Sequence, residues 1–365
     1  MSTNETENMV SLNDELEKKI SEIRDLRYNL LRVKKSYGRF VPKNLISLIG
    51  VDEITEVNLG DQAEKKLTVL FSDIRNFSTF SENLSSEEIF NFINSYMGVM
   101  EPPINRNNGI IDKFIGDAIM ALFPGTPDQA LCASIAMMES LTHYNKYRKS
   151  KGYSDINIGI GLNTGIVTFG IIGHLKRMEG TVLGDAVNVA SRVESLTKQY
   201  KVNILIGEDA YIGLENPDAF CLRLVDRIRV KGRLRPVSIY ECFDSNSPEE
   251  IRNKLISLGL FNKGVACYHM KAVDEAFVLF NKCQEIAPED TVVSTYLDRC
   301  KTFQERGVFD GVDIWLEAVE WREEYSVHSE DIDVGCPNRA LAVDRFLDRI
   351  PWNRRSRVYA AASSG

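Results

Sequence analysis

Two aspartates follow stretches of sequence that predict buried β-strands, and carboxylates in such positions can bind cations. Residues 67–71 form an apolar, partly β-branched run shortly before Asp73, and such runs are typical of buried central strands. Two further β-rich runs flank Ile115-Gly116-Asp117, which predicts a hairpin whose tip presents a second carboxylate. A lone aspartate after a strand usually caps the next turn, and this is the alternative for Asp73. Two carboxylates on adjacent strand ends are also what a pair of Mg²⁺ ions needs for phosphoryl chemistry.

Four sequence motifs carry a resemblance to a known family. They are, in chain order, FSDIRNFSTFSE, DKFIGDAIMALF, GTVLGDAVNVASRVESLTK and VKGR. Together they resemble the catalytic domain of class III nucleotidyl cyclases over residues 66–243. The resemblance implies an α+β fold, the ferredoxin-like palm, with helices on one face of a mainly antiparallel sheet. It also implies two Mg²⁺ or Mn²⁺ ions per active site, bound by Asp73, Asp117 and the backbone carbonyl of Ile74.

Two polar side chains lie one turn apart on the helix predicted over residues 184–200. Asn188 and Arg192 therefore share a face of that helix. The resemblance implies that Asn188 holds the ribose and that Arg192 stabilises the transition state at the α-phosphate, a role that suits a forked cationic donor. Taken alone, Arg192 would more simply be a surface residue paired with Glu194 or its neighbours. Lys231 matches the family lysine that contacts the terminal phosphates.

Two further positions imply which purine is bound. The resemblance places Lys113 and Thr181 beside the base, where a lysine donates to adenine N1 and a threonine hydroxyl accepts from the exocyclic amine. The pair implies ATP as substrate, with 3′,5′-cyclic AMP and pyrophosphate as products. The threonine variant resembles a bacterial and soluble animal subgroup that is often stimulated by bicarbonate. Lys113 and Asp117 lie too close on one hairpin to serve the same nucleotide, and in the family they serve opposite sites of a head-to-tail homodimer.

Two other functions compete with an adenylate cyclase. A catalytically silent cyclase-like module would bind nucleotide and pass on a signal, but degenerate domains usually lose at least one functional residue, and here the set is complete. A diguanylate cyclase on a related palm fold would carry a GGDEF-like motif, and the sequence has none. The sequence therefore favours the adenylate cyclase.

Composition excludes other classes of protein. The 365 residues are 44% hydrophobic and 26% charged, which is ordinary for a soluble globular protein. The net charge of −8 argues against wholesale binding of nucleic acid. No apolar run is long enough to span a membrane, and the polar residues 1–7 do not resemble a secretory signal. Seven cysteines without a CxxC pair predict reduced thiols and a cytoplasmic location.

The first two segments of the chain are expected to be a helix and the catalytic domain. Residues 8–42 carry a heptad pattern that predicts a short parallel coiled coil, and the alternative is an amphipathic helix packed on its own domain. Residues 39–42 resemble the transducer segment that precedes many cyclase domains. The catalytic domain is expected over residues 62–245.

The remaining segments are expected to be a helical region and a tail. Residues 248–305 are similar to one tetratricopeptide repeat, with a plain helical hairpin as the alternative. An upstream sensor or protein partner could act through this segment or through the coiled coil. The tail, residues 306–365, begins like a bacterial haemerythrin-like domain, but Cys336 stands where that family has a histidine ligand. Its end is basic, then small and polar, which is typical of disordered termini.

Local signals predict where several elements begin and end. Ser85 and Glu88 have the spacing of a capping box at the start of a helix, and the proline pair at residues 102–103 predicts the end of that helix after Met100. Residues 163–165, Asn-Thr-Gly, predict a turn after a strand over residues 156–162. Two β-rich runs around Lys231 predict a closing hairpin, over residues 222–230 and 237–243.

Overall fold

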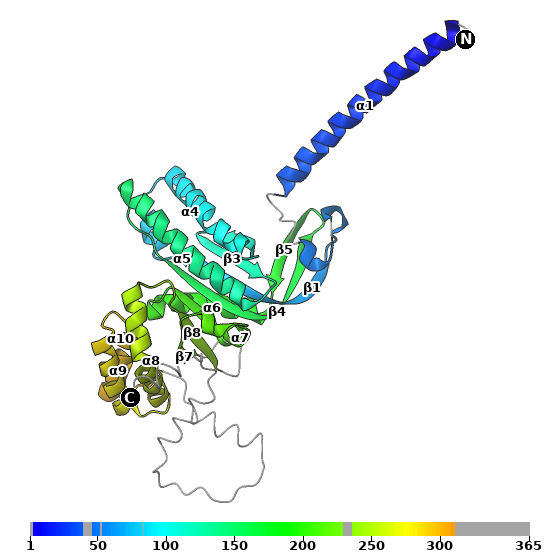
Figure 1. Cartoon of the computed structure of the whole chain (residues 1–365). Coiled ribbons are helices and arrows are strands. Elements are labelled where there is room, and N and C mark those ends of the chain that lie inside the picture. The colour runs from blue at the N-terminus through cyan, green and yellow to red at the C-terminus, as the bar shows by residue number, and fades with distance from the viewer. Residues whose placement is uncertain (1–2, 39–45, 52, 83, 229–235, 311–365) are drawn as a thin grey trace, which may run out of the picture. The chain divides into compact units, whose positions relative to one another are not determined.

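The computed structural model describes residues 3–38, 46–51, 53–82, 84–228 and 236–310 (Figure 1). The chain divides into two compact units. The first comprises residues 1–63 and 169–181, and the second comprises residues 64–168 and 182–365. Residues 39–42 and most of the predicted tail, 311–365, lie outside the described residues.

Eight strands among the described residues form one sheet. Their order is β2 (Ile110–Ile115), β3 (Ala118–Phe123), β1 (Gln62–Ile74), β4 (Ile158–His174), β6 (Ile204–Gly207), β8 (Val237–Cys242) and β7 (Leu222–Ile228), with β5 (Arg177–Leu183) paired to β4. The β4–β6 pair is parallel, and the β1–β3, β2–β3, β6–β8 and β7–β8 pairs are antiparallel. Successive residues of β1 are buried, including Leu67, Val69 and Leu70, because both of its faces are covered. The sheet and its helices confirm the predicted α+β fold.

Three long helices of the second unit pack with the sheet. These are α4 (Ser86–Arg106), α5 (Pro127–Ser150) and α6 (Asp185–Tyr200), and α4 and α5 lie side by side (Figure 1). The short helices are α3 (Phe77–Ser81) and α7 (Glu208–Ile212), with 3-10 turns at Ser47–Ile49, Ile54–Glu56 and Pro217–Ala219. No helix among the described residues combines the length and the apolar character needed to cross a membrane.

The predicted start of α4 is confirmed, but its predicted end is wrong. The Ser85 hydroxyl accepts a hydrogen bond from the Glu88 amide at 3.3 Å, and the Glu88 carboxylate accepts one from the Ser85 amide at 2.8 Å. The helix continues through both prolines to Arg106. A proline inside a helix removes a hydrogen bond and crowds the carbonyl four residues earlier. Here the last turn still forms because Ile104 is fully buried in the core, so packing outweighs that cost.

The turn predicted at residues 163–165 is also wrong, because β4 runs straight through it to His174. Asn163 and Thr164 are buried, and the Thr164 hydroxyl lies 2.8 Å from that of Thr68. Gly165 serves close packing instead of a turn, since a Cβ at this position would lie 2.7 Å from the Cβ of Ala186. The glycine therefore lets the start of α6 approach the strand.

The carboxyl-terminal helices form a group of three where the sequence predicted two. They are α8 (Pro248–His269), α9 (Val273–Ile286) and α10 (Thr291–Arg306), and α8 packs against β7. A buried ionic network joins them to the sheet. Arg223 on β7 bonds Glu241 at 2.6 Å and Asp290 at 2.8 Å, and Lys254 on α8 bonds Glu241 at 2.6 Å. Buried charges need such partners because their desolvation is costly.

A second buried cluster joins these helices to the end of α6. Asp226 accepts a bond from Arg299 on α10 at 2.7 Å and lies 2.9 Å from Nε2 of His269 on α8. The hydroxyl of Tyr200, the last residue of α6, also bonds Asp226. Burial alone would raise the pKa of Asp226, but the bond from His269 and the charge of Arg299 hold it below its usual range. The helices are thus fixed to the sheet and to α6 by charged side chains that are almost fully buried.

The Asp226 cluster predicts a large loss of stability for Asp226→Asn. That change removes the buried counter-charge of Arg299 and leaves it, among the described residues, only the exposed carboxylate of Asp310. Breaking a buried ion pair costs about 3–5 kcal/mol. Denaturant unfolding of the full chain measures the loss. Asp298→Asn on the exposed side of α10 is the matched control, and it should change the free energy of unfolding by less than about 0.5 kcal/mol. Equal effects of the two changes would contradict the assigned role of the cluster.

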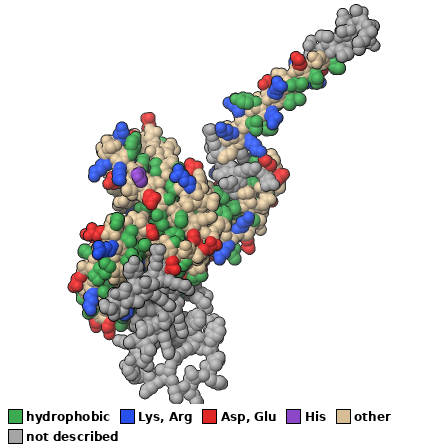
Figure 2. Space-filling view, in the orientation of Figure 1, with side chains coloured by type: hydrophobic (Ala, Val, Ile, Leu, Met, Phe, Trp, Pro, Cys, Tyr) green, Lys and Arg blue, Asp and Glu red, His purple; other side chains and the backbone are tan. Residues whose placement is uncertain are grey.

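The first unit contains the long helix α1 (Thr3–Tyr37). The predicted heptad seam has ten positions, and Lys19 is the one that breaks its apolar pattern. Six of its apolar residues are between 55% and 68% exposed, namely Leu12, Leu16, Ile23, Leu26, Leu30 and Val33. Figure 2 shows hydrophobic side chains along α1 among charged ones. An exposed seam of this length is unusual for a helix of a folded protein. The coiled coil that would cover it stays a prediction.

Candidate active site

The pairing of β1 with β3 brings the two predicted metal-binding aspartates together. Ser72 lies opposite Ile119 in this pair, so Asp73 comes next to the β2–β3 turn that carries Asp117. Gly116 turns the chain there with a φ of 64°, a conformation that glycine adopts without strain. Burial, followed by the hydrogen bond and charge of Asp73, raises the pKa of Asp117 to about 6. The predicted hairpin and its juxtaposed carboxylates are therefore present in the structure.

The arrangement of these carboxylates fits a divalent metal ion. Oδ2 of Asp117 is buried and has no hydrogen-bond partner among the described residues. A carboxylate oxygen without a donor is costly to bury, and a cation would remove that cost. No group of three or more acidic, histidine or cysteine side chains in the described chain is placed to hold a metal. Two carboxylates are nevertheless sufficient for Mg²⁺, which usually takes its other ligands from water and substrate phosphates.

Three charged residues beside the aspartates were not predicted from the sequence. Nζ of Lys198 on α6 donates to Oδ2 of Asp73 at 2.6 Å. The charges of Arg75 and Glu194 also act on this site, and Nη2 of Arg75 donates to the carbonyl of Val202 at 2.7 Å. The signal that could have revealed them is the spacing of Glu194 and Lys198 on one helix, which places both on the same face.

Glu194 is buried although it carries an ionisable group. Its side chain lies against β4, where a Cβ on Gly159 would come within 3.0 Å of Oε1, and one on Gly161 would lie 2.1 Å from the Glu194 amide. The residue is 7% exposed, and Oε1 has no hydrogen-bond partner in the described chain. Burial and then the charge of Asp73 raise its pKa to about 7, against the opposing charges of Lys198 and Arg75.

The raised pKa of Glu194 predicts how stability depends on pH. A carboxyl whose folded pKa lies above its unfolded pKa stabilises the fold at low pH, and this contribution is lost as pH rises toward the folded value near 7. The wild type should therefore lose stability as pH rises, whereas Glu194→Gln should not. In EDTA, the free energy of unfolding of Glu194→Gln relative to that of the wild type should rise by about 2 kcal/mol from about pH 5 to about pH 8. Denaturant unfolding at both pH values tests this. A constant difference, or the same gain in the exposed control Glu275→Gln, would contradict it.

Asn188 and Arg192 are exposed on α6, on a different side from Lys198. Neither makes a hydrogen bond or ion pair among the described residues. The alternative in which Arg192 pairs with Glu194 is wrong, because Glu194 is buried beside Asp73. At 100° per residue, Arg192 and Lys198 point about 120° apart around the helix axis. One face of α6 thus serves the aspartates of its own chain, and the other is left open.

The residues predicted to bind the base lie on two different strands. Lys113 lies in β2 opposite Met120, and its Nζ is 3.5 Å from Oδ2 of Asp112. Thr181 lies in β5, is partly buried and belongs to the first unit. Lys231 lies outside the described residues. The structure therefore brings together Asp73, Asp117 and Ile74, whose amide contacts the Asp117 carboxylate.

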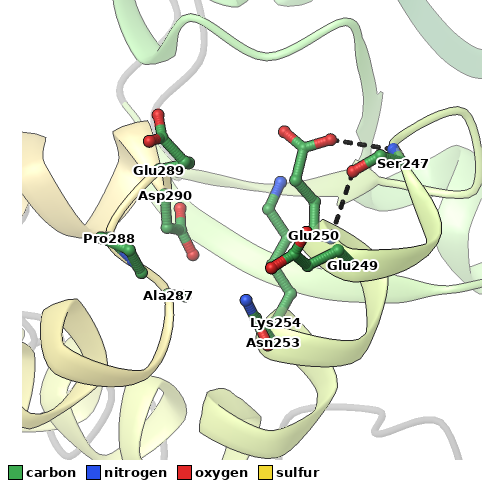
Figure 3. A pocket seen from close by; sticks show the side chains of 9 residues that line it. All are labelled: Ser247, Glu249, Glu250, Asn253, Lys254, Ala287, Pro288, Glu289 and Asp290. Atoms are coloured by element: carbon green, nitrogen blue, oxygen red, sulfur yellow. Dashed lines mark hydrogen bonds between the residues drawn. The ribbon is translucent and has the colours of Figure 1, made fainter.

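A cavity of about 380 Å³ lies elsewhere in the second unit, between the start of α8 and the turn from α9 to α10 (Figure 3). None of the predicted site residues lines it. Its lining includes Lys254 and Asp290, which are engaged in the buried ionic network, and Ser247 and Glu250, which cap α8. The polar groups of this cavity therefore hold the helices in place.

Comparison with known proteins identifies the family. Residues 59–243 match the family described as the adenylate and guanylate cyclase catalytic domain. An adenylate cyclase of Anabaena cylindrica is 44% identical over 225 residues, which are 59% of this chain and 45% of that protein. The terminal-differentiation-specific adenylate cyclase of Dictyostelium discoideum is 38% identical over 271 residues, 72% of this chain and 13% of that protein.

A solved structure extends the comparison to the fold. The structure of a bacterial light-regulated adenylyl cyclase superposes with a TM-score of 0.53 at 25% identity, covering 63% of this chain and 66% of that one. The chain spans less than half the length of the curated relatives it matches. The matched residues make up about half of the chain and include both aspartates and α6. The chain belongs to the family of adenylate and guanylate cyclase catalytic domains.

Proposed function

We propose that this protein is an adenylate cyclase that converts ATP to 3′,5′-cyclic AMP and pyrophosphate. The observation that carries the proposal is the pair Asp73 and Asp117 at adjacent strand ends, with a buried oxygen of Asp117 left without a partner. The names of the similar proteins from Anabaena and Dictyostelium support this activity. The alternative is a silent module that binds nucleotide without turnover.

The reaction joins the 3′-oxygen of ATP to its own α-phosphorus. The 3′-hydroxyl gives its proton to water and its oxygen forms a bond to the α-phosphorus. The bond between the α-phosphorus and the oxygen that bridges to the β-phosphorus breaks, and pyrophosphate leaves with that oxygen. Asp73, Asp117 and the Ile74 carbonyl would hold two Mg²⁺ or Mn²⁺ ions per site, and these ions would supply charge that favours loss of the hydroxyl proton and departure of the phosphates.

The remaining predicted residues bind and orient the nucleotide. Asn188 holds the ribose, and Arg192 donates hydrogen bonds to the α-phosphate as its charge grows. Lys231 contacts the terminal phosphates. Lys113 and Thr181 hold adenine through its N1 and its exocyclic amine. Bicarbonate is proposed as an activator on the resemblance of this Lys–Thr pair, and it should raise turnover when it is titrated into the assay.

The complete site requires two chains in a head-to-tail homodimer. Asp73 and Asp117 come from one chain, and the nucleotide-binding residues come from its partner. The two faces of α6 support this proposal, because Lys198 contacts Asp73 of its own chain whereas Asn188 and Arg192 are exposed and unpaired within the described chain. A closed two-fold dimer would then contain two equivalent sites.

The segments outside the catalytic region are proposed to control this dimer. We propose a coiled coil and transducer over residues 8–42, the catalytic domain over residues 62–245 and a tetratricopeptide-like region over residues 248–305, followed by a tail. The exposed apolar seam of α1 supports the coiled coil. A sensor or partner protein would act through α1 or the carboxyl-terminal helices.

Deletion of residues 1–36 tests the contribution of α1 to dimerisation. Because each proposed site is shared, activity follows the population of dimer. We expect the deletion to reduce specific activity most at low protein concentration, with recovery as the protein is concentrated. Activity measured across a dilution series, alongside sedimentation of both proteins, provides the comparison. If the deleted protein has full activity at every dilution, α1 does not hold the dimer together.

The activity itself is tested with the purified full chain. The protein is incubated with ATP or GTP and Mn²⁺, and cyclic product is separated by chromatography. Cyclic AMP from ATP is the expected result, and Asp73→Asn should abolish it. Nucleotide binding without any cyclic product would favour the silent module.

A further inference from the structure

The ion pair between Lys198 and Asp73 occupies the carboxylate that the proposed metal requires. Nζ of Lys198 lies 2.6 Å from Oδ2 of Asp73, and the two side chains are 49% and 24% exposed. A pair so open to solvent is worth up to about 1 kcal/mol, so a divalent cation can displace the lysine. Lys198 and a metal ion cannot both contact the same carboxylate oxygen at bonding distance.

A second acidic residue, Glu194, lies near Lys198 on the same helix. Glu194 lies four residues earlier, and a glutamate in this position before a lysine forms a favourable pair on a helix surface. Glu194 is only 7% exposed, and its Oε1 has no hydrogen-bond partner in the described chain. The charge of Lys198 already acts on Glu194. A buried carboxylate that lacks a hydrogen bond is costly, so a nearby ammonium would stabilise it.

The other cation of the site is less free to move. Arg75 donates from Nη2 to the backbone carbonyl of Val202 at 2.7 Å and is partly buried. Among the described residues, Lys198 bonds Asp73 alone, and its side chain is flexible. The cation that responds to metal binding is therefore Lys198.

We propose that Lys198 is a displaceable counter-ion of the metal site, paired with Asp73 when metal is absent and with Glu194 when metal is bound. The proposal rests on the proposed metal site at Asp73 and Asp117. In the empty enzyme the lysine neutralises Asp73 and competes with the metal. In the loaded enzyme Glu194 receives the lysine, so the displaced charge keeps a partner. The balance between these two pairings of Lys198 would determine the apparent affinity of the site for metal.

Calorimetric titration of Mn²⁺ into the nucleotide-free full chain tests this without any turnover. Lys198→Gln removes the competitor, so Mn²⁺ should bind up to about fivefold more tightly, the factor that corresponds to about 1 kcal/mol. Lys282→Gln on the exposed surface of α9 removes the same charge elsewhere and should leave the affinity unchanged. An affinity of Lys198→Gln equal to or weaker than that of the wild type would overturn the proposal.

The role of Glu194 needs a double-mutant cycle, because removal of an acid near the site also weakens cation binding directly. Glu194→Gln should weaken Mn²⁺ binding, since the displaced lysine then has no second partner. In the Lys198→Gln background the same change should weaken Mn²⁺ binding less, because only the direct electrostatic loss remains and no lysine needs a second partner. An equal weakening in both backgrounds would show direct electrostatics and would overturn the second position of the lysine.

A separate control distinguishes failure of the metal site from failure of the lysine. Asp73→Asn should abolish Mn²⁺ binding if the proposed site exists. If the wild type and Asp73→Asn bind Mn²⁺ alike, the metal site is misplaced and the proposal fails with it. If Asp73→Asn abolishes binding while Lys198→Gln behaves as the wild type, the metal site stands and only the counter-ion proposal fails.

Discussion

We expect a mixture of Asp73→Ala and Arg192→Ala chains to recover about a quarter of the wild-type activity, although each variant alone is almost inactive. Asp73→Ala disables the metal half of a shared site, and Arg192→Ala disables the nucleotide half. Each homodimer therefore lacks one essential group in both of its sites. In a mixed dimer, one site receives both lesions and the other receives neither.

The expected fraction follows from random pairing. Equal mixing makes about half of all dimers mixed, and each mixed dimer has one working site of two. Cyclic AMP production after subunit exchange is the measurement, and a tagged pull-down confirms the exchange. Mixing Asp73→Ala with Asp117→Ala is the matched control, because both lesions then fall in the same half and no intact site forms. Recovery in neither mixture, with exchange confirmed, would exclude the shared site.

The second large effect concerns the choice of base. Replacing Lys113 with Glu and Thr181 with Cys should lower the preference for ATP over GTP by about 100-fold, which corresponds to two hydrogen bonds of about 1.5 kcal/mol each. A lysine beside guanine N1 meets a donor where adenine offers an acceptor. The ratio of kcat/KM for the two nucleotides measures the preference.

A control and a wild-type measurement make the base assignment falsifiable. Lys149→Glu on the exposed end of α5 changes the same charge outside the four motifs and should leave the nucleotide preference intact. The wild type should turn over GTP poorly. Comparable turnover of ATP and GTP by the wild type would show that Lys113 and Thr181 do not read the base.

The sequence predicted the parts of the site that depend on local pattern. The apolar run before Asp73 and the β-rich runs around Gly116 were sufficient to place two strand ends and a hairpin. The two errors arose where tertiary packing overrides local signals. Burial of Ile104 stabilises the last turn of α4 after its two prolines. Gly165 does not form a turn, and its missing side chain allows close packing against Ala186.

Contacts between residues far apart in the chain were not predictable. The pair Lys198–Asp73 joins positions separated by 125 residues, and no periodicity encodes such a distance. The alternative that paired Glu194 with Arg192 at the surface did not foresee the burial of Glu194. That burial depends on glycines of a strand that lies more than thirty residues earlier. The predicted site residues came from the family resemblance, and the fold shows the charges around Asp73 and Asp117.

The buried ionic network determines how long a fragment of this chain must be to keep its buried charges paired. A fragment that ends after β8 would keep Arg223 and Asp226 but lose Asp290, Lys254, His269 and Arg299, which are their partners or neighbours in the network. Unpaired charges in its sheet would then face water through an opened core. The family match ends at residue 243, yet buried ion pairs connect the sheet to α8 and α10. A chimaera that transfers this region to another protein should therefore include residues through Asp310, whose carboxylate accepts a hydrogen bond from Arg299 at 3.1 Å.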